Sequence, residues 1–234
     1  MNAADPLILP ADAPLAHRRY WYALYRRDVE QARAMVERAL REWSPQRIYL
    51  RMFEPALGMS GTLFAAGKIT WQDEHFVTHH TLRLMRLVRR RFVPVETFGP
   101  LALATGVEQD SHLIGLRMVC DFLQWANWRI HWLSSNERGT LANAVERLRP
   151  DAVLLSLGLD TAVRPAARMV ETLRRQQYPG IIAVGGGAVN RNPDIVREVG
   201  ADVTAPSALE FLRRVGRRGS ATPRDLGGAT PGAP

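Results

Sequence analysis

The chain has very little cysteine: Cys120 is the only one among 234 residues. An internal disulfide is therefore excluded, and with it a disulfide-stapled scaffold. No apolar run approaches the roughly 20 residues that a membrane-spanning helix needs. The first residues also lack the charged-then-apolar order of a signal peptide. We therefore expect a cytoplasmic protein without membrane association, with Cys120 as a small core residue.

Negative charge is also in deficit. The chain carries 31 Lys and Arg against 23 Asp and Glu, a formal net charge of +8, and most of the excess comes from arginine. Such a surface favours anionic ligands or nucleic acid, but charge alone names no partner. The sequence shows no internal repeat and no helix-turn-helix module with a recognition helix. Direct nucleic-acid binding therefore stays open.

The N-terminal part is organised as helices with short connections, which predicts an antiparallel four-helix bundle over residues 17–93. Residues 1–16 are expected to be a flexible leader. Ser44 is the expected N-cap of a helix with Pro45 in its first turn, and Thr70 the N-cap of a long helix. The predicted helical segments are 17–43, 44–66 with breaks at Gly58 and Gly61, and 71–92.

After Pro94 the pattern changes to short apolar runs that alternate with amphipathic segments. This alternation predicts βαβ units and a parallel sheet, hence an α/β domain of Rossmann-like, flavodoxin-like type over residues 94–216. The Gly/Pro/Ala-rich tail at 217–234 is expected to be disordered. The predicted strands lie near residues 100–105, 128–133, 152–157, 181–184 and 202–204.

The most informative motif is Asp110-x-His112-x-x-Gly115, which follows a buried-strand pattern at Leu101–Thr105 and precedes a helix predicted from Leu113 to Trp125. A histidine on such a loop lies at the carboxyl edge of a parallel sheet, where α/β folds bind ligands. Imidazole is a common metal ligand, and a nearby carboxylate can hold its other N–H. A loop histidine that caps the following helix is the competing interpretation.

Two further strand ends support a ligand site. The run that ends in Ser156-Leu157 and the run that ends in Gly185-Gly186-Gly187 follow the histidine loop in the chain. This ordered trio resembles the cobalamin-binding domain family over about residues 99–216. One departure is Gly158, because the family usually has leucine two positions after the serine.

The resemblance implies a role for each element. His112 is the expected lower axial ligand of cobalt, Asp110 its hydrogen-bonding partner, with Ser111 between them, and Gly115 the residue that lets the corrin approach. The strand-end residues would line the slot for the displaced dimethylbenzimidazole tail of a base-off, His-on cofactor. The slot residues are Ser156, Leu157, Gly185, Gly186 and Gly187.

The helical half extends the resemblance to residues 17–216. The pattern from Glu54-Pro55 to Ile69, followed by Glu74-His75, is similar to the helical cap over the upper corrin face in methionine synthase, corrinoid methyl carriers and light-sensing regulators. Light-sensing regulators have a Trp-His pair ahead of the Glu-His pair, with nine residues between the Trp and the Glu. Here Phe64 and Ala65 occupy those positions, so Phe64, Glu74 and His75 are the expected cofactor contacts. Trp71 is in another register and is expected to be a packing residue.

The loss of volume at positions 64 and 65 implies a roomier cap. Photocobilins, cobalamin-domain photoreceptors, are proposed to hold a bilin beside the cobalamin, and a biliverdin here would contact His79, His80, Arg83 and Arg86. Ordinary solvated or packed side chains are the competing interpretation. Arg90 continues the arginine stripe. Aromatic residues are available from the first helices, although most are expected in the core: Tyr20, Trp21, Tyr22, Tyr25, Trp43 and Phe53.

These observations favour a non-enzymatic light sensor that holds adenosylcobalamin between cap and α/β domain. Light would cleave the Co–C bond and change cap packing and oligomer or partner contacts, in a homodimer or with a downstream transcription regulator. The alternative is a corrinoid methyl carrier, a non-catalytic subunit of a methyltransferase system. A cobalamin chaperone is a third hypothesis, and a mutase subunit fits least. The sequence leaves open the upper axial ligand, the bilin, the oligomer number, the partner, and whether the chain was cut from a larger protein.

Overall fold

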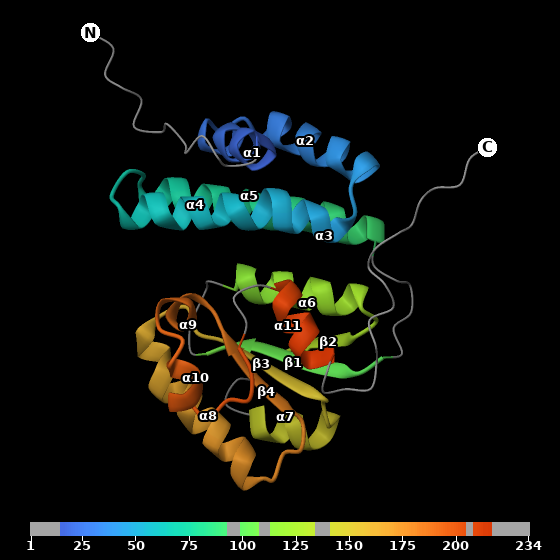
Figure 1. The fold of residues 1–234 in the computed structure, drawn as a ribbon, viewed down its shortest axis with the longest axis vertical. Coiled ribbons are helices and arrows are strands. Elements are labelled where there is room, and N and C mark those ends of the chain that lie inside the picture. The colour runs from blue at the N-terminus through green and yellow to red at the C-terminus, as the bar shows by residue number, and fades with distance from the viewer. Residues whose placement is uncertain (1–14, 93–98, 108–112, 134–140, 205–207, 217–234) are drawn as a thin grey trace, which may run out of the picture. The chain divides into compact units, whose positions relative to one another are not determined.

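The computed structural model describes residues 15–92, 99–107, 113–133, 141–204 and 208–216. The chain divides into two compact units, residues 1–93 and residues 94–234, and each is described by itself. The first is helical and the second is an α/β unit (Figure 1). The expected fold class is therefore confirmed. The leader and tail predictions fall outside the described residues, except that Leu15 and Ala16 open the first helix.

Five helices build the helical unit in two layers, with α1 and α2 packed on α4 and α5 (Figure 1). Asp28 caps α2 by accepting a hydrogen bond from the Gln31 N–H at 2.9 Å, and Ser44 caps α3 through the Arg47 N–H at 3.2 Å. The prediction of Ser44 as an N-cap is confirmed. The helices are α1 (Leu15–Tyr25), α2 (Val29–Glu42), α3 (Pro45–Ile48), α4 (Glu54–Ala65) and α5 (Trp71–Phe92).

The prediction of breaks at Gly58 and Gly61 is wrong, because α4 runs through both. The irregularity lies earlier, in a π-helical turn at Tyr49–Phe53 that joins α3 to α4. Pro55 follows this turn and has no N–H to offer the carbonyl four residues before it, which explains why the regular ladder is interrupted there. Gly58 lies between the good helix formers Leu57 and Met59, and the packing of α4 against α1 and α5 offsets the cost of both glycines.

Aromatic side chains fill the core of the helical unit. Tyr20, Trp21 and Phe53 have no exposed surface. The Tyr20 hydroxyl lies 2.9 Å from Thr81 Oγ1, and the Trp21 indole N–H donates to Ser60 Oγ at 2.7 Å, so the polar atoms of these two aromatic side chains have partners. These three aromatics therefore stabilise the bundle, as the competing interpretation predicted.

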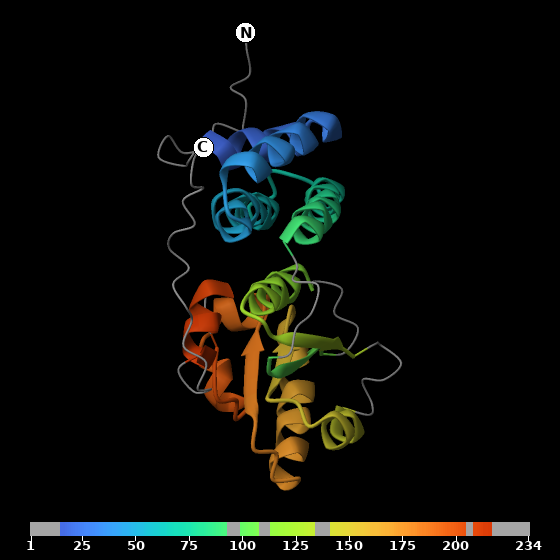
Figure 2. The ribbon, with the colours of Figure 1, turned by 90° about the vertical axis from the view of Figure 1, so that its right-hand side faces the viewer.

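The α/β unit holds a four-stranded parallel sheet in the order β2-β1-β3-β4. Helices α6 and α11 cover one face, and α7 and α8 cover the other (Figure 2). Where a fifth strand was predicted, Val203 makes an isolated parallel bridge to Ala183. The strands are β1 (Leu101–Gly106), β2 (Arg129–Trp132), β3 (Ala152–Ser156) and β4 (Ile181–Gly185). The helices are α6 (Ile114–Trp125), α7 (Leu141–Leu148), α8 (Val163–Arg175), α9 (Gly187–Arg191), α10 (Ile195–Glu198) and α11 (Ala208–Gly216), with a 3₁₀ turn at Asp160–Ala162.

This strand order places a topological switch point between β1 and β3. After β1 the chain adds β2 on one side, then returns to add β3 and β4 on the other. In open parallel sheets the connections leave a crevice at the carboxyl ends of the two strands at such a point. Any ligand site of the α/β unit is therefore expected at the ends of β1 and β3. Cys120 is buried in this unit, as expected, and burial raises the pKa of its thiol.

Candidate functional site

The carboxyl ends of three strands finish level at the switch point. Gly106 of β1 is registered opposite Ser156 of β3, and Ser156 is registered opposite Gly185 of β4. Backbone hydrogen bonds between neighbouring strands continue for one residue beyond these strand ends. The Val107 N–H donates to the Ser156 carbonyl at 2.9 Å, and the Leu157 N–H donates to the Gly185 carbonyl at 2.8 Å. The sheet thus brings together the strand-end residues that the sequence singled out.

The Ser156 side chain is buried but makes no hydrogen bond to any described residue. Its exposed fraction is 2%. The neighbouring Thr105 differs, because its hydroxyl donates to the Gly106 carbonyl at 3.1 Å. Buried hydroxyls normally have a partner. A hydroxyl without one at a ligand-binding edge is available to a polar atom of a bound molecule.

The three glycines at the end of β4, Gly185, Gly186 and Gly187, differ in the space that a Cβ would have. Gly186 has φ of +103°, and a Cβ there would lie 2.6 Å from the Leu157 carbonyl oxygen. A Cβ on Gly187 would lie 2.9 Å from the Gly158 carbonyl oxygen. Both positions therefore require glycine so that the two strand-end loops can approach. Gly158 stands where the resembled family usually has leucine, and its backbone carbonyl is the group that lies against Gly187.

Gly185 and Gly115 are different, because a Cβ on either would meet nothing within 4 Å. The protein itself does not demand glycine there. Gly115 is exposed in the first turn of α6, and Gly185 ends β4 beside Ser156. Open space at both positions fits the approach of a bulky ligand to the backbone.

The predicted cobalt ligand His112 lies outside the described residues, together with Asp110 and Ser111, so their placement stays a prediction. The described chain resumes at Leu113, and α6 begins at Ile114. Leu113 is the N-cap residue of α6, and its side chain makes no capping hydrogen bond. Position 112 precedes the N-cap residue, which gives no support to the interpretation of His112 as the N-cap.

In the helical unit the predicted cap residues gather at the tip formed by the end of α4 and the start of α5. Phe64 is 48% exposed and Trp71 is 60% exposed, which is unusual for large apolar side chains. The packing role expected for Trp71 is therefore wrong. Trp71 directly follows the Thr70 cap, and its indole meets the edge of the His75 ring, with centroids 5.8 Å apart.

Glu74 and His75 lie on the first turn of α5 beside this tip. The Thr78 hydroxyl donates to Glu74 Oε1 at 2.7 Å, and His75 Nδ1 lies 3.8 Å from Glu74 Oε2. The His75 side chain is 59% exposed against 20% for Glu74. The carboxylate is therefore held by its own helix, while the imidazole is accessible.

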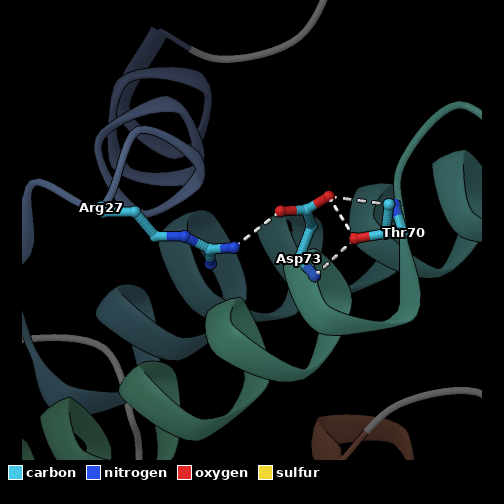
Figure 3. A network of polar contacts seen from close by, with 3 residues as sticks. All are labelled: Arg27, Thr70 and Asp73. Carbon is cyan, nitrogen blue, oxygen red and sulfur yellow. Dashed lines mark hydrogen bonds and ion pairs between the residues drawn. The ribbon is translucent and has the colours of Figure 1, made fainter.

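A capping box fixes the start of α5 (Figure 3). Thr70 Oγ1 accepts a hydrogen bond from the Asp73 N–H at 3.2 Å, and Asp73 Oδ2 accepts from Thr70 N–H and Oγ1 at 3.0 and 2.6 Å. These hydrogen bonds hold the pKa of the Asp73 carboxyl below its usual range. The predicted N-cap Thr70 is confirmed. The role of Asp73 could have been found from the T-x-x-D spacing.

The proposed bilin contacts continue along α5. His80 packs on Phe76 with ring centroids 4.2 Å apart and meets the edge of His79 at 5.4 Å. Burial, and then the positive charges of His79, Arg83 and Arg27, lower the pKa of His80. His79, Arg83 and Arg86 are exposed. In the described part of the chain, no group of three acidic, histidine or cysteine side chains could hold a metal ion.

The parallel sheet, its 2-1-3-4 order and the level strand ends define a flavodoxin-like ligand-binding unit, here joined to a helical unit. Two family models, each described as a B12 binding domain, match residues 16–89 and residues 100–213. The chain therefore carries a pair of B12-binding domains and binds a cobalamin or related corrinoid. The open space at Gly115 and Gly185 and the Ser156 hydroxyl, which bonds to no described residue, fit such a group.

One solved structure shares the fold, and two others are less similar. The monomethylamine corrinoid protein of Methanosarcina barkeri is similar with a TM-score of 0.73 and 18% identity, covering 85% of this chain and 96% of that one. The methanol:cobalamin methyltransferase complex MtaBC of Methanosarcina barkeri gives 0.49 and 16%, covering 90% and 83%. A cobalamin-binding protein of Desulfitobacterium hafniense DCB-2 gives 0.47 and 20%, covering 85% and 96%. No curated protein matches this chain.

Among the described helices, none combines the length and apolar character that crossing a bilayer requires.

Proposed function

We propose that this chain is a corrinoid carrier of a methyl-transfer system and has no catalytic activity of its own. The observation that carries the proposal is the pair Phe64-Ala65 at the exposed tip of the helical unit. Alanine offers no atom that could ligate cobalt at the position where light-sensing regulators have histidine. An upper axial position free of this ligand suits a cofactor whose bound group must be exchanged with partner enzymes.

The roles of the α/β residues follow from this proposal. His112 would ligate cobalt from below as a neutral imidazole, with Asp110 taking its other N–H and so fixing the tautomer. The Ser156 hydroxyl would donate a hydrogen bond to the nucleotide tail in the slot lined by Leu157 and the glycines at 185–187. Gly115 would leave room for the corrin edge. The corrinoid supplies cobalt as acceptor and donor of the methyl group.

The roles of the helical residues are to shield and to position. Phe64 and Trp71 present apolar ring surface at one tip, which suits contact with a flat, largely apolar macrocycle and excludes water from it. Glu74 is held by Thr78 and can keep the exposed His75 oriented. The monomethylamine corrinoid protein, with a TM-score of 0.73, supports the carrier proposal through its shared fold.

A light sensor with adenosylcobalamin is the second candidate. The exposed rings of Phe64 and Trp71 are the observation that favours it, because aromatic surface of this kind can pack beside an adenosyl group. Biliverdin contacts by His79, His80, Arg83 and Arg86, a homodimer and a downstream regulator belong to this candidate.

The test begins with the full chain reconstituted in the dark with methylcobalamin and, separately, with adenosylcobalamin. A carrier should hold either cofactor base-off with His112 on cobalt, and His112→Ala should lose that His-on spectrum. After light has removed the methyl group and titanium(III) citrate has reduced the cobalt to Co(I), the bound corrinoid should be remethylated by methyl iodide, with loss of iodide, at a rate near that of the free corrinoid. Failure of remethylation on the protein would exclude the carrier.

The same samples test the sensor. A sensor predicts that illumination of the adenosylcobalamin complex changes both its absorption spectrum and its elution volume. A carrier predicts photolysis no different from that of the free cofactor and an unchanged elution volume. Addition of biliverdin should produce no persistent far-red band if the chain is only a carrier.

A further inference from the structure

A concave site in the helical unit is lined by residues of α1 and α2. It has a volume of about 630 Å³, within the usual range for organic ligands of roughly 300–1,000 Å³. Met52, which is 2% exposed, is one of its lining residues. The other lining residues are Leu15, Ala16, Arg19 and Tyr22 from α1, Gln31, Met35, Arg38, Ala39 and Glu42 from α2, and Trp43. We call this site the α1–α2 groove.

The groove has two aromatic walls that are held in place by arginines outside it. The guanidinium of Arg26 donates to the Tyr22 hydroxyl at 3.2 Å and lies 5.6 Å from the centre of its ring. The guanidinium of Arg47 lies 4.8 Å from the centre of a Trp43 ring. Neither arginine lines the groove. Rings fixed in this way lose little further freedom when a flat molecule packs against them.

The charge of the lining is positive. Arg19 is exposed and makes no ion pair or side-chain hydrogen bond to any described residue. Arg38 pairs with Glu42 at 3.4 Å, and both side chains are more than half exposed, so the ion pair is weak. The carboxylate of a ligand can therefore replace Glu42 on Arg38. The lining thus carries two guanidiniums, Arg19 and Arg38, and one carboxylate, Glu42. A planar guanidinium binds a carboxylate through two parallel hydrogen bonds.

We propose that the α1–α2 groove binds a flat organic carboxylate, with its aromatic or apolar body between Tyr22 and Trp43 and its carboxylate on Arg19. The site is separate from the residues assigned to the corrinoid: Phe64, Glu74 and His75 do not line it. The proposal does not depend on whether the chain is a carrier or a sensor.

The test uses the full chain and 4-biphenylcarboxylate as the probe, with titration calorimetry as the measurement. The uncharged 4-biphenylmethanol, of the same shape, is the matched control ligand. The carboxylate should bind at one site. Arg19→Gln should weaken its affinity about tenfold, the size expected for one charge-assisted hydrogen-bonded pair. The same variant should leave the affinity of the alcohol nearly unchanged.

Two variants control for general effects. Ala16→Trp fills the groove from a partly exposed wall position and should abolish binding of both probes. Arg33→Gln removes an exposed arginine of α2 that lies outside the groove and should change neither affinity. Circular dichroism should show that each variant is folded.

Three results would overturn the proposal: no saturable binding of the carboxylate, equal losses in Arg19→Gln and Arg33→Gln, or unchanged binding in Ala16→Trp. A shift of elution volume in Ala16→Trp without probe binding by the parent chain would assign the groove to a contact between two copies. That result would also overturn it.

Discussion

Arg27 and Asp73 form an ion pair at 2.7 Å that ties the α1–α2 turn to the first turn of α5 (Figure 3). Arg27 adopts φ of +64° in that turn, and its guanidinium also lies 4.1 Å from the centre of the Phe76 ring. Asp73 completes the capping box with Thr70. One carboxylate therefore fixes both the turn and the start of the helix that carries Trp71, Glu74 and His75.

Asp73→Ala should lower the free energy of unfolding by about 1–2 kcal/mol, because it removes the capping box and the ion pair together. Arg27→Ala should cost less, since it removes a partly exposed pair and leaves the cap intact. Chemical denaturation of both variants measures the difference. Glu37→Gln breaks the exposed Arg33–Glu37 pair as a control. An Arg27 effect as large as that of Asp73 would contradict the assignment of the stabilisation to the cap.

Burial and the charge of Arg18 lower the pKa of His17, which is 5% exposed. The unfolded chain titrates near the ordinary histidine value of about 6.5. Above that pH both states are neutral at His17 and stability is full. As the pH falls below about 6.5, the unfolded state binds the proton first, so the free energy of unfolding decreases until the lower folded pKa is passed.

The melting temperature should therefore drop between pH 7.5 and pH 5.5, and His17→Gln should reduce the drop. His80 carries a lowered pKa for similar reasons, so His80→Gln should reduce it further. His75→Gln, at a side chain that is 59% exposed, is the matched control. If the drop in His17→Gln equals that of the parent chain, His17 does not contribute to it.

The main elements of the fold could be predicted from the sequence because their signals are local. The predicted strand at 181–184 and the observed Ile181–Gly185 agree within a residue, since an apolar run between Gly180 and a glycine triplet leaves little choice. The failed helix breaks at Gly58 and Gly61 show the limit of such signals. A glycine weakens a helix by about 1 kcal/mol, and favourable neighbours can outweigh that cost.

The site was only partly predictable. The carboxyl ends of parallel strands share one edge, so Ser156 and Gly185 were expected near each other. Their direct registry with each other and with Gly106 depends on sheet pairing, which no local pattern encodes. The outward position of Trp71 depends on tertiary packing for the same reason. The placement of His112 lies outside the described residues and stays a prediction.

Gly186 and Gly115 should separate folding from ligand binding. Gly186→Ala forces a side chain into a φ of +103° and to 2.6 Å from the Leu157 carbonyl oxygen. A loss of about 1–3 kcal/mol in the free energy of unfolding is expected. Gly115→Ala meets nothing within 4 Å and should leave stability unchanged or slightly increased.

Cobalamin binding by Gly115→Ala is the second readout. If Gly115 provides clearance for the corrin, Gly115→Ala should weaken cobalamin binding although the protein is fully folded. Equilibrium dialysis with hydroxocobalamin and thermal melts of the apoprotein give the two readouts. Unchanged cobalamin affinity in Gly115→Ala would remove this residue from the site.

Ala65→His restores the imidazole that light-sensing regulators carry beside Phe64. Ala65 is exposed at the end of α4, so the substitution should not disturb the helix core. If position 65 faces the upper side of the corrin, the new imidazole should bind cobalt and give the absorption spectrum of two histidine ligands. Reduction to Co(I) by titanium(III) citrate should then slow, and remethylation by methyl iodide with it, because the two imidazoles stabilise the higher oxidation states of cobalt and both must leave. Ala66→His moves the imidazole by one residue, about 100° around the helix, and should change neither the spectrum nor the rate.

The same spectrum and rate in the parent chain, Ala65→His and Ala66→His would mean that position 65 does not face cobalt. That result would remove the observation on which the carrier proposal rests.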